Sequence, residues 1–285
     1  MKTGFIGLGA MGYSMARNLH QAGLLAGVYN RNPVKGASFC QQVGAPAFRS
    51  MAELTQHCEA LVLCVSADAD VLAVIDEIAG ALPDGGLVID CSTVSRDTAK
   101  QAAAKLALHD CSFLDAPVSG GTEGAKNGTL SIMVGGEQKD FERARPLFDA
   151  MGSRAILMGP VGAGQATKAV NQVMAAGINQ AVTEAMAFAE SLQLPIEQLV
   201  EVVGNGAAGN WFVNHRGVTM VKGEYPPGFK LALHLKDLKI CAQMAHDAGV
   251  KLPLSSNTID DYQQLLEQGH GDEDISALYR LKSKS

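Results

Sequence analysis

The sequence lacks the features of a nucleic-acid-binding or membrane protein. It has no basic excess, because 23 lysines and arginines stand against 29 aspartates and glutamates for a formal net charge of −6. Binding to nucleic acid or to an anionic membrane would need a basic surface. No apolar run reaches the roughly 18–20 residues that span a bilayer, and a signal segment has no room before the glycines at 7–12. We therefore expect a cytoplasmic protein with no nucleic-acid partner and no membrane partner.

The sequence also lacks disulfide and metal-ligand patterns. Its six cysteines form no CxxC pair, and several lie in apolar runs typical of strands. Reduced, buried thiols are therefore expected. The seven histidines show neither metal-ligand spacing nor a pairing with a nucleophilic Ser or Cys. We expect no metal cofactor.

Length and local pattern indicate two domains, since 285 residues exceed a typical single domain. Up to about residue 162, short apolar runs alternate with helical patterns, which is typical of a parallel sheet with helices on both faces. Beyond a Pro/Gly-rich stretch at 159–164, Gln165 to about Gln193 indicates one long helix, and strand signals become weak. We predict an α/β Rossmann-type dinucleotide-binding domain over 1–162, followed by an all-α C-terminal domain over 163–285 that the long helix joins to it.

The apolar periodicity also gives bounds for the individual elements. The predicted strands are Thr3–Ile6, Ala26–Tyr29, Ala60–Cys64, Leu87–Asp90, Ser112–Asp115 and Leu130–Gly135. The shorter predicted helices include Met11–Ala22, Asp97–Leu108, His234–Ala248 and Leu254–Gln268.

A GxGxxG sequence lies directly after the first predicted strand and opens a helix, as the dinucleotide fingerprint requires. Gly7 permits a tight turn, Gly9 lets the backbone approach a pyrophosphate, and Gly12 lets helix and strand pack closely. The alternative is a purely structural turn. The predicted cofactor-binding residues of this loop are Gly7, Leu8, Gly9, Ala10, Met11 and Gly12.

The end of the second predicted strand indicates which dinucleotide is bound. An NAD-binding protein usually has an Asp or Glu there, about 20 residues after the glycines, to accept from the ribose 2′-hydroxyl. Residues 29–33 contain no acid, and Asn30 is followed by Arg31, which can pair with a 2′-phosphate. We therefore predict NADP(H), with NAD(H) as the weaker alternative. The competing interpretation of Arg31 is a solvated surface arginine.

Three further segments carry a family resemblance: DAPVSGG at 115–121, GAGQATKAVNQ at 162–172 and FKLALHLKDL at 229–238. With the opening GFIGLGAMGYSMARNL, they resemble the β-hydroxyacid dehydrogenase family. Its members include 3-hydroxyisobutyrate dehydrogenase, tartronate semialdehyde (2-hydroxy-3-oxopropionate) reductase and γ-hydroxybutyrate dehydrogenase. The resemblance covers essentially the whole chain. It implies an oxidoreductase that moves hydride between NADP(H) and a short β-hydroxy acid or semialdehyde acid, a small anionic substrate. It also implies a homodimer or homotetramer formed through the helical domain.

Lys168 is the predicted catalytic residue. Reduction of a semialdehyde needs a proton for the carbonyl oxygen, and a lysine can stabilise the developing alkoxide and supply that proton. Lys168 lies in the first turns of an otherwise apolar helix, and the resemblance assigns the catalytic role to this lysine. The alternative is a lysine at an exposed helix edge.

The substrate-binding residues are predicted around two segments. Ser119, Gly120 and Gly121 follow a strand at the carboxyl edge of the sheet, where open α/β folds bind ligands, and the resemblance gives them substrate contacts. Asn171 and Gln172 follow Lys168 by three and four residues, so they share its helical face. Some relatives have Asn-Asn there, and Asn-Gln is closer to the tartronate semialdehyde reductase branch.

Four more positions complete the predicted site. Lys236 is expected at the cofactor or the substrate acid by resemblance, although a lone Lys-Asp pair is more often a surface ion pair. Thr93 and Ser66, which follow two predicted strands, are expected to face the nicotinamide half of the cofactor. Trp211, the only tryptophan, is a candidate for the substrate pocket, but core or interface packing is its commoner fate. We expect the active site in the cleft between the two domains.

Two other functions compete with a dehydrogenase. Imine reductases share the architecture but usually lack the lysine at position 168. A non-catalytic NADP-binding module would also have no use for it. 6-Phosphogluconate dehydrogenase has a Lys-x-x-His-Asn motif, whereas this chain has Lys-Ala-Val-Asn-Gln at 168–172. The sequence leaves open which semialdehyde or hydroxy acid is the substrate, because an apolar pocket discriminates one carbon by only about 1–3 kcal/mol.

Overall fold

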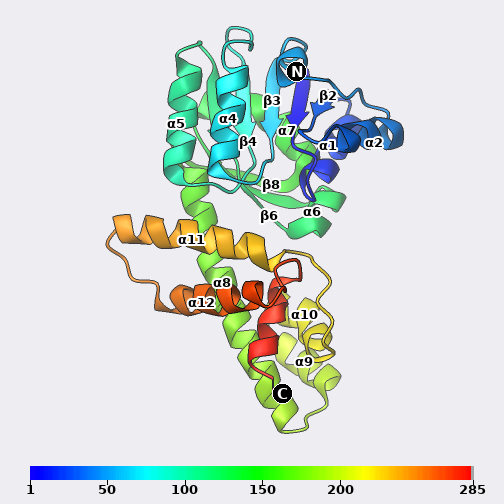
Figure 1. Cartoon of the computed structure of the whole chain (residues 1–285), viewed down its shortest axis with the longest axis vertical. Helices are drawn as coiled ribbons and strands as arrows, with labels where there is room; N and C mark the ends of the chain where they lie inside the picture. The colour runs from blue at the N-terminus through cyan, green and yellow to red at the C-terminus, as the bar shows by residue number, and fades with distance from the viewer. Residues whose placement is uncertain (284–285) are drawn as a thin grey trace. The chain divides into compact units, whose positions relative to one another are not determined.

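A computed structural model describes residues 1–283 (Figure 1), and the chain divides into two compact units, 1–168 and the remainder from 169. The first unit is built on a β-sheet and the second is helical. The predicted fold class is confirmed. The long helix α8 (Ala163–Ser191) begins in the first unit and continues into the second.

The first unit is an eight-stranded sheet in the order β2-β1-β3-β4-β5-β7-β6, with β8 paired to β7. The five strands from β2 to β5 in that order are parallel. In contrast, β7 runs antiparallel to β5 and to β6, and β8 is parallel to β7. The strands are β1 (Thr3–Ile6), β2 (Leu25–Tyr29), β3 (Ala60–Leu63), β4 (Leu87–Asp90), β5 (Ser112–Asp115), β6 (Val118–Ser119), β7 (Leu130–Gly135) and β8 (Gly152–Gly159).

All six predicted strands exist, and four have the predicted bounds. The expectation of a parallel sheet is wrong for β7, because the short connection through β6 and α6 (Gly121–Asn127) returns the chain in the opposite direction. Strands β6 and β8 were not predicted. β6 has only two residues. The apolar run of β8, residues 155–158, is short, and a run of that length does not by itself distinguish a strand from a helix.

Helices cover both faces of the sheet, as predicted. One hydrophobic core joins the sheet to α1 (Gly12–Gln21), α2 (Pro33–Val43) and α7 (Gln138–Met151). The other joins it to α3 (Met51–Thr55), α4 (Asp68–Ile78) and α5 (Arg96–Ala107). Figure 1 shows α4 and α5 side by side on one face.

The second unit packs its helices around one core that includes Met186, Leu235, Leu238 and Leu278. Two buried side chains of this core are hydrogen-bonded to each other: Asn179 Nδ2 donates to the Tyr262 hydroxyl over 2.8 Å. Besides the greater part of α8, the helices are α9 (Ile196–Gly204), α10 (Trp211–Val221), α11 (Leu231–Asp247), α12 (Pro253–Glu267) and the 3₁₀ helix η1 (Ile275–Leu281).

All six cysteines lie among the described residues, and none of them is in a disulfide. Cys58, Cys91, Cys111 and Cys241 are buried as expected, but Cys40 is exposed, because its position on α2 faces solvent. In the part of the chain that the structure describes, we find no helix with the length and apolar character that crossing a membrane requires.

Candidate active site

The glycine-rich loop has the geometry of a phosphate cradle. Gly7 adopts φ = 101°, a backbone conformation that favours glycine. A Cβ on Gly12 would lie inside van der Waals contact of the Gly7 carbonyl oxygen, so helix α1 packs too closely for a side chain there. A Cβ on Gly9 would meet no atom within 4 Å. The protein therefore needs glycine at 7 and 12, while the open space at Gly9 fits a bound dinucleotide at the helix N-terminus.

Two residues after β2 bear on this loop: Asn30 is hydrogen-bonded to it, and Arg31 carries an exposed guanidinium group. The Leu8 amide donates to Asn30 Oδ1 over 2.8 Å, and Asn30 Nδ2 donates to the Asn32 carbonyl over 2.9 Å. The Asn30 side chain thus fixes the loop backbone. Arg31 has an 87% exposed side chain, and its Nη1 lies 3.1 Å from Oδ1 of Asp70 on α4. Among the described residues, the carboxylate that pairs with Arg31 thus comes from α4, and the loop after β2 itself supplies no acid.

The loops after β3 and β4 are joined at their bases. The Val65 amide donates to Ser92 Oγ over 2.9 Å. This bond brings together the loops that carry Ser66, which is exposed, and Thr93, which is partly buried. The adjacent parallel pairing of β3 and β4 places both loops at the carboxyl edge of the sheet, where open α/β sheets bind ligands.

The start of α8 is capped by a carboxylate from β5. Gly162 precedes this helix and has no side chain that could accept from its first amides. Asp115, fully buried at the end of β5, supplies that acceptor: Oδ1 receives the Gly162 amide over 2.7 Å and Oδ2 the Gln165 amide over 2.8 Å. A negative charge there also suits the helix dipole. Burial raises the pKa of Asp115 from its ordinary value, and the backbone amides oppose the rise.

Two glycines make room for this carboxylate. A Cβ on Gly135 of β7 would collide with Asp115 Oδ1, and a Cβ on Gly164 would lie 2.8 Å from Oδ2 and 2.6 Å from the Asp115 carbonyl oxygen. The glycines around the helix start are therefore explained by the approach of β5, β7 and α8.

Lys168 lies in the second turn of α8 and is only 7% exposed. Its Nζ donates to the Val118 carbonyl over 2.8 Å. Val118 directly precedes Ser119, so the ammonium group lies beside the segment predicted to bind the substrate. Burying an ammonium group is costly, and buried lysines of this kind are typical of functional sites.

The substrate segment itself is held at the edge of the sheet. Ser119 pairs with Ser131 of β7, and Gly120 and Gly121 adopt φ values of 129° and 62°. Positive φ at two consecutive residues turns the chain from β6 directly into α6. Ser119, Gly120 and Lys168 therefore belong to one compact part of the first unit.

In the second unit, four predicted or neighbouring residues form one polar network. Asn171 Nδ2 donates to Gln172 Oε1 over 2.8 Å, and Gln172 Nε2 donates to Asp237 Oδ2 over 2.6 Å. Lys236 Nζ lies 3.0 Å from Asp237 Oδ1. Asp237 is buried, so this Lys-Asp pair is more than a surface contact. Since a carboxylate only accepts, it fixes which way the Gln172 amide faces.

Trp211 contacts a different set of side chains. It opens α10, where the preceding Asn210 caps the helix by accepting from the Val213 amide over 2.9 Å. The indole is 56% exposed, stacks on His215 with ring centroids 4.3 Å apart, and carries the Arg216 guanidinium 5.2 Å from its centroid. Trp211 therefore does not pack in the core of this chain, and its place in the substrate pocket or in an interface stays a prediction.

A buried carboxyl group lies three residues before Thr93. Asp90 ends β4 and is fully buried, and it accepts from the Ser92 amide over 2.9 Å. Burial raises the pKa of Asp90 to about 7, and the Asp115 and Asp68 carboxylates add to the rise. Among the described buried atoms, its Oδ2 has no hydrogen-bond partner.

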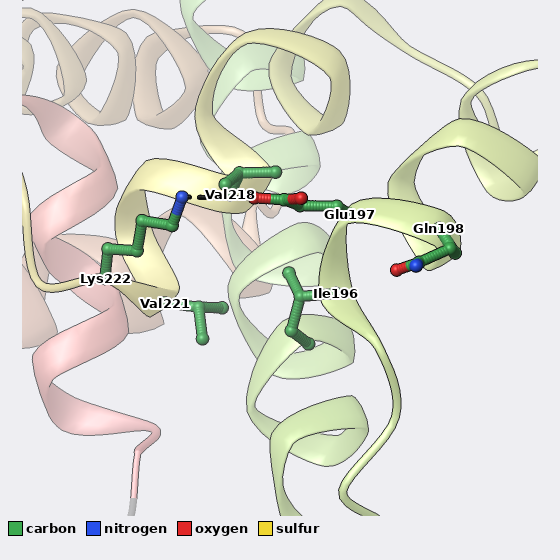
Figure 2. A pocket seen from close by; sticks show the side chains of 6 residues that line it. All are labelled: Ile196, Glu197, Gln198, Val218, Val221 and Lys222. Atoms are coloured by element: carbon green, nitrogen blue, oxygen red, sulfur yellow. Dashed lines mark hydrogen bonds and ion pairs between the residues drawn. The ribbon is translucent and has the colours of Figure 1, made fainter.

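A separate depression of about 320 Å³ lies between α9 and α10 (Figure 2). Its lining is Ile196, Glu197, Gln198, Val218, Val221 and Lys222. The only charges in it are an exposed pair, Lys222 Nζ to Glu197 Oε1 at 3.2 Å. None of the predicted site residues lies there, and the depression offers no buried group for proton transfer.

The glycine cradle after β1 and the family comparisons together define a class: an oxidoreductase that binds a nicotinamide dinucleotide. Residues 2–159 match the family model for the NAD binding domain of 6-phosphogluconate dehydrogenase, and residues 162–282 match the model for the NAD-binding region of NADP-dependent 3-hydroxyisobutyrate dehydrogenase. The chain belongs to the 3-hydroxyisobutyrate dehydrogenase family, that is, the β-hydroxyacid dehydrogenases. The resemblance found in the sequence is confirmed.

Individual relatives cover the whole chain. The 2-hydroxy-3-oxopropionate reductase of Escherichia coli is 35% identical over 98% of this chain and 96% of its own length. The NAD-dependent L-serine dehydrogenase of Pseudomonas aeruginosa is 35% identical over 97% and 96%. The solved structure of Mycobacterium tuberculosis 3-hydroxyisobutyrate dehydrogenase with L-serine superposes with a TM-score of 0.88 at 32% identity, covering 98% of each chain.

Two residues of this site were not singled out from the sequence: Asp115 as the cap of α8, and Gln165. Their partners lie 47 to 73 residues away in the chain. The only local signal was Gly162, a residue without a capping side chain at the predicted start of a long helix.

Proposed function

We propose that this enzyme reduces a short semialdehyde acid, or oxidises the matching β-hydroxy acid, with Lys168 as general acid and base. The observation that carries the proposal is the buried ammonium group on the Val118 carbonyl, next to Ser119. When bound, the reduced dinucleotide supplies a hydride to the carbonyl carbon. Lys168 Nζ donates the proton that the carbonyl oxygen needs, and in the oxidation it takes that proton back.

The remaining predicted residues bind the acid in this proposal. The Ser119 hydroxyl and the amides of Gly120 and Gly121 bind the substrate carboxylate, with polar help from Asn171 and Gln172. Lys236 binds the cofactor or the substrate acid, and Trp211 lines the substrate pocket. Tartronate semialdehyde, succinic semialdehyde and the 3-hydroxyisobutyrate type are the candidate substrates. The Escherichia coli relative, named as a 2-hydroxy-3-oxopropionate reductase, supports testing tartronate semialdehyde first.

The test is initial rates with a panel of short semialdehyde acids, with Lys168→Ala in parallel. Loss of a general acid lowers kcat by about 10²–10⁴-fold, while the affinity for the dinucleotide stays near that of the wild type. Lys100→Ala is the matched control, because Lys100 is an exposed lysine of α5. A wild-type protein that binds the dinucleotide but turns over none of the acids contradicts the proposal. Imine reduction or a non-catalytic module would then be favoured.

We propose NADP(H) as the preferred cofactor, held by the loop at 7–12 and by Arg31, with Asn30 fixing that loop and Ser66 and Thr93 at the nicotinamide half. Arg31 supports this because no acid stands at the end of β2, and its exposed pair with Asp70 is worth little. A 2′-phosphate carries more charge than the carboxylate and can take over the guanidinium. NAD(H) is the weaker alternative, and the Pseudomonas relative is named as NAD-dependent.

We propose that two or four copies of the chain associate through α8 as a homodimer or homotetramer. Apolar side chains recur along α8 at helical spacing and are exposed: Val170 (59%), Met174 (58%), Ile178 (40%) and Phe188 (66%), and Leu192 (53%) follows directly after the helix. Such a stripe on a 29-residue helix is typical of an interface. Light scattering should give a dimer or tetramer mass, and Met174→Glu should lower it. A monomer for the wild type at micromolar concentration contradicts this part.

A further inference from the structure

The side chain of Gln165 is hydrogen-bonded to the backbone on both sides of one residue, Thr93, in the loop after β4. Gln165 lies in the first turn of α8, three residues before Lys168, and is 1% exposed. Its Nε2 donates to the Ser92 carbonyl over 2.8 Å, and its Oε1 accepts from the Val94 amide over 3.2 Å. These two backbone groups stand on either side of Thr93. A single side-chain amide therefore fixes the backbone before and after that residue.

The same residue is also tied to β5. Its backbone amide donates to Asp115 Oδ2 over 2.8 Å, and one turn further along the helix Lys168 Nζ donates to the Val118 carbonyl. The short segment from Gln165 to Lys168 is thus bound to the loop after β4, to the end of β5 and to β6. Its attachments set the spacing between Thr93 and the lysine ammonium group.

These two hydrogen bonds need both the donor and the acceptor of a side-chain amide. The Val94 amide requires an acceptor and the Ser92 carbonyl requires a donor, and a neutral glutamine supplies one of each. An apolar side chain of similar length would fill the same volume but would leave both backbone groups without this partner. Docking of a helix on a loop by apolar packing would not select a side chain that pairs on both sides of Thr93.

We propose that Gln165 is a positioning residue for hydride transfer, which holds the Thr93 loop at a fixed separation from Lys168. This inference rests on the proposed function, because it gives Thr93 to the nicotinamide half of the cofactor and Lys168 to proton transfer. Gln165 itself touches neither cofactor nor substrate. It acts through the backbone of the loop, and its loss lets the two reacting ends of the site drift apart.

The first experiment compares the kinetic constants of the variant Gln165→Met with those of the variant Gln180→Met. Gln180 is the matched control because it lies on the same helix, is also buried, and pairs with Thr258 and Asp261 in the second unit. For Gln165→Met we expect kcat to fall by about tenfold to a hundredfold, as misplacement on the ångström scale does, with the KM for the acid little changed. A larger primary deuterium isotope effect on kcat with 4-deuterated cofactor should accompany the fall.

A second readout needs no turnover. Hydrogen exchange of the Val94 amide, measured on the protein without cofactor, should quicken in Gln165→Met and stay unchanged in Gln180→Met. The hydrogen bond to Oε1 protects that amide in the wild type.

Gln165→Glu gives a pH-dependent rescue that a purely structural role would not show. A protonated carboxyl has one donor and one acceptor, as the amide has, whereas the ionised form only accepts and faces the Ser92 carbonyl oxygen. Burial and the neighbouring Asp115 and Asp90 carboxylates favour the protonated form. The kcat ratio of Gln165→Glu to Gln165→Met should therefore rise as the pH is lowered from about 8 to about 6. Groups common to both variants cancel in this ratio.

The outcomes separate this inference from the proposed function. An active wild type together with a kcat for Gln165→Met within about twofold of it overturns the inference alone, because misplacement should cost more. An equal loss in Gln180→Met also overturns it, since the effect would then be general to α8. A wild type without turnover on any acid overturns the proposed function and this inference together.

Discussion

Removing the remote cap of α8 is expected to cost the first unit much of its stability. In Asp115→Asn the amide oxygen still accepts one of the two backbone N–H groups, but the amide NH₂ faces the other. One buried N–H without a partner costs about 1–3 kcal/mol, and the lost capping carboxylate adds about 1 kcal/mol. The total is roughly 2–4 kcal/mol, which for a unit of this size lowers Tm by about 5–15 °C.

Two measurements check this value. Scanning calorimetry gives the shift in Tm, and hydrogen exchange locates it, because the amides of Gly162 and Gln165 should exchange faster in the variant. Asp97→Asn is the control: it is also an aspartate in the first turn of a helix, α5, but it is exposed. Its cost should stay within about 0.5 kcal/mol. If Asp115→Asn melts within about 2 °C of the wild type, the assigned role of the two hydrogen bonds is refuted.

Three further predictions concern the cofactor site and pH. Gly9→Ala should weaken dinucleotide binding in a fluorescence titration at unchanged Tm, whereas Gly12→Ala should lower Tm; equal affinity for Gly9→Ala would refute the cradle. Arg31→Ala should raise the Kd for NADPH but not for NADH, and Asp70→Asn should lower the Kd for NADPH. If neither variant changes the ratio of the NADPH Kd to the NADH Kd, Arg31 is a solvated surface arginine. Burial raises the pKa of Asp90 from 3.8 to about 7, so its contribution to stability is full below about pH 4 and is lost as the pH rises to about 7, on the order of 4 kcal/mol in all. Asp90→Asn should flatten the fall of Tm between about pH 5 and pH 7, and an unchanged slope would contradict the raised pKa.

Much of the fold follows from the sequence because the buried strands carry their own signal. Strand β3 is apolar throughout and β4 is apolar up to Asp90 at its end, and both are fully buried, so the sequence predicts their position closely. Strand β8 was not predicted because its apolar run, residues 155–158, is too short to distinguish a strand from a helix. The direction of β7 was predicted wrongly because strand direction depends on the connection and leaves no mark in the strand itself.

The candidate site was only partly predictable. The glycine loop and Lys168 lie in local motifs, and the structure gives each a geometry that suits the predicted chemistry. Asp115 and Gln165 act through partners far along the chain, and an aspartate at a strand end or a glutamine in a helix has no local pattern that reveals such a partner. The exposure of Trp211 likewise depends on how α10 packs, which a single aromatic residue does not report.

The cap that β5 provides to α8 also bears on the order in which the chain folds. Asp115 and Gly162 are separated by 47 residues, and β7 with its glycine at 135 must stand between them before the carboxylate is enclosed. Closing a loop of that length costs entropy that local helix formation does not repay. We therefore expect the turn that carries Lys168 to become ordered only after the sheet has formed. Substitutions at Asp115 should speed unfolding far more than they slow folding.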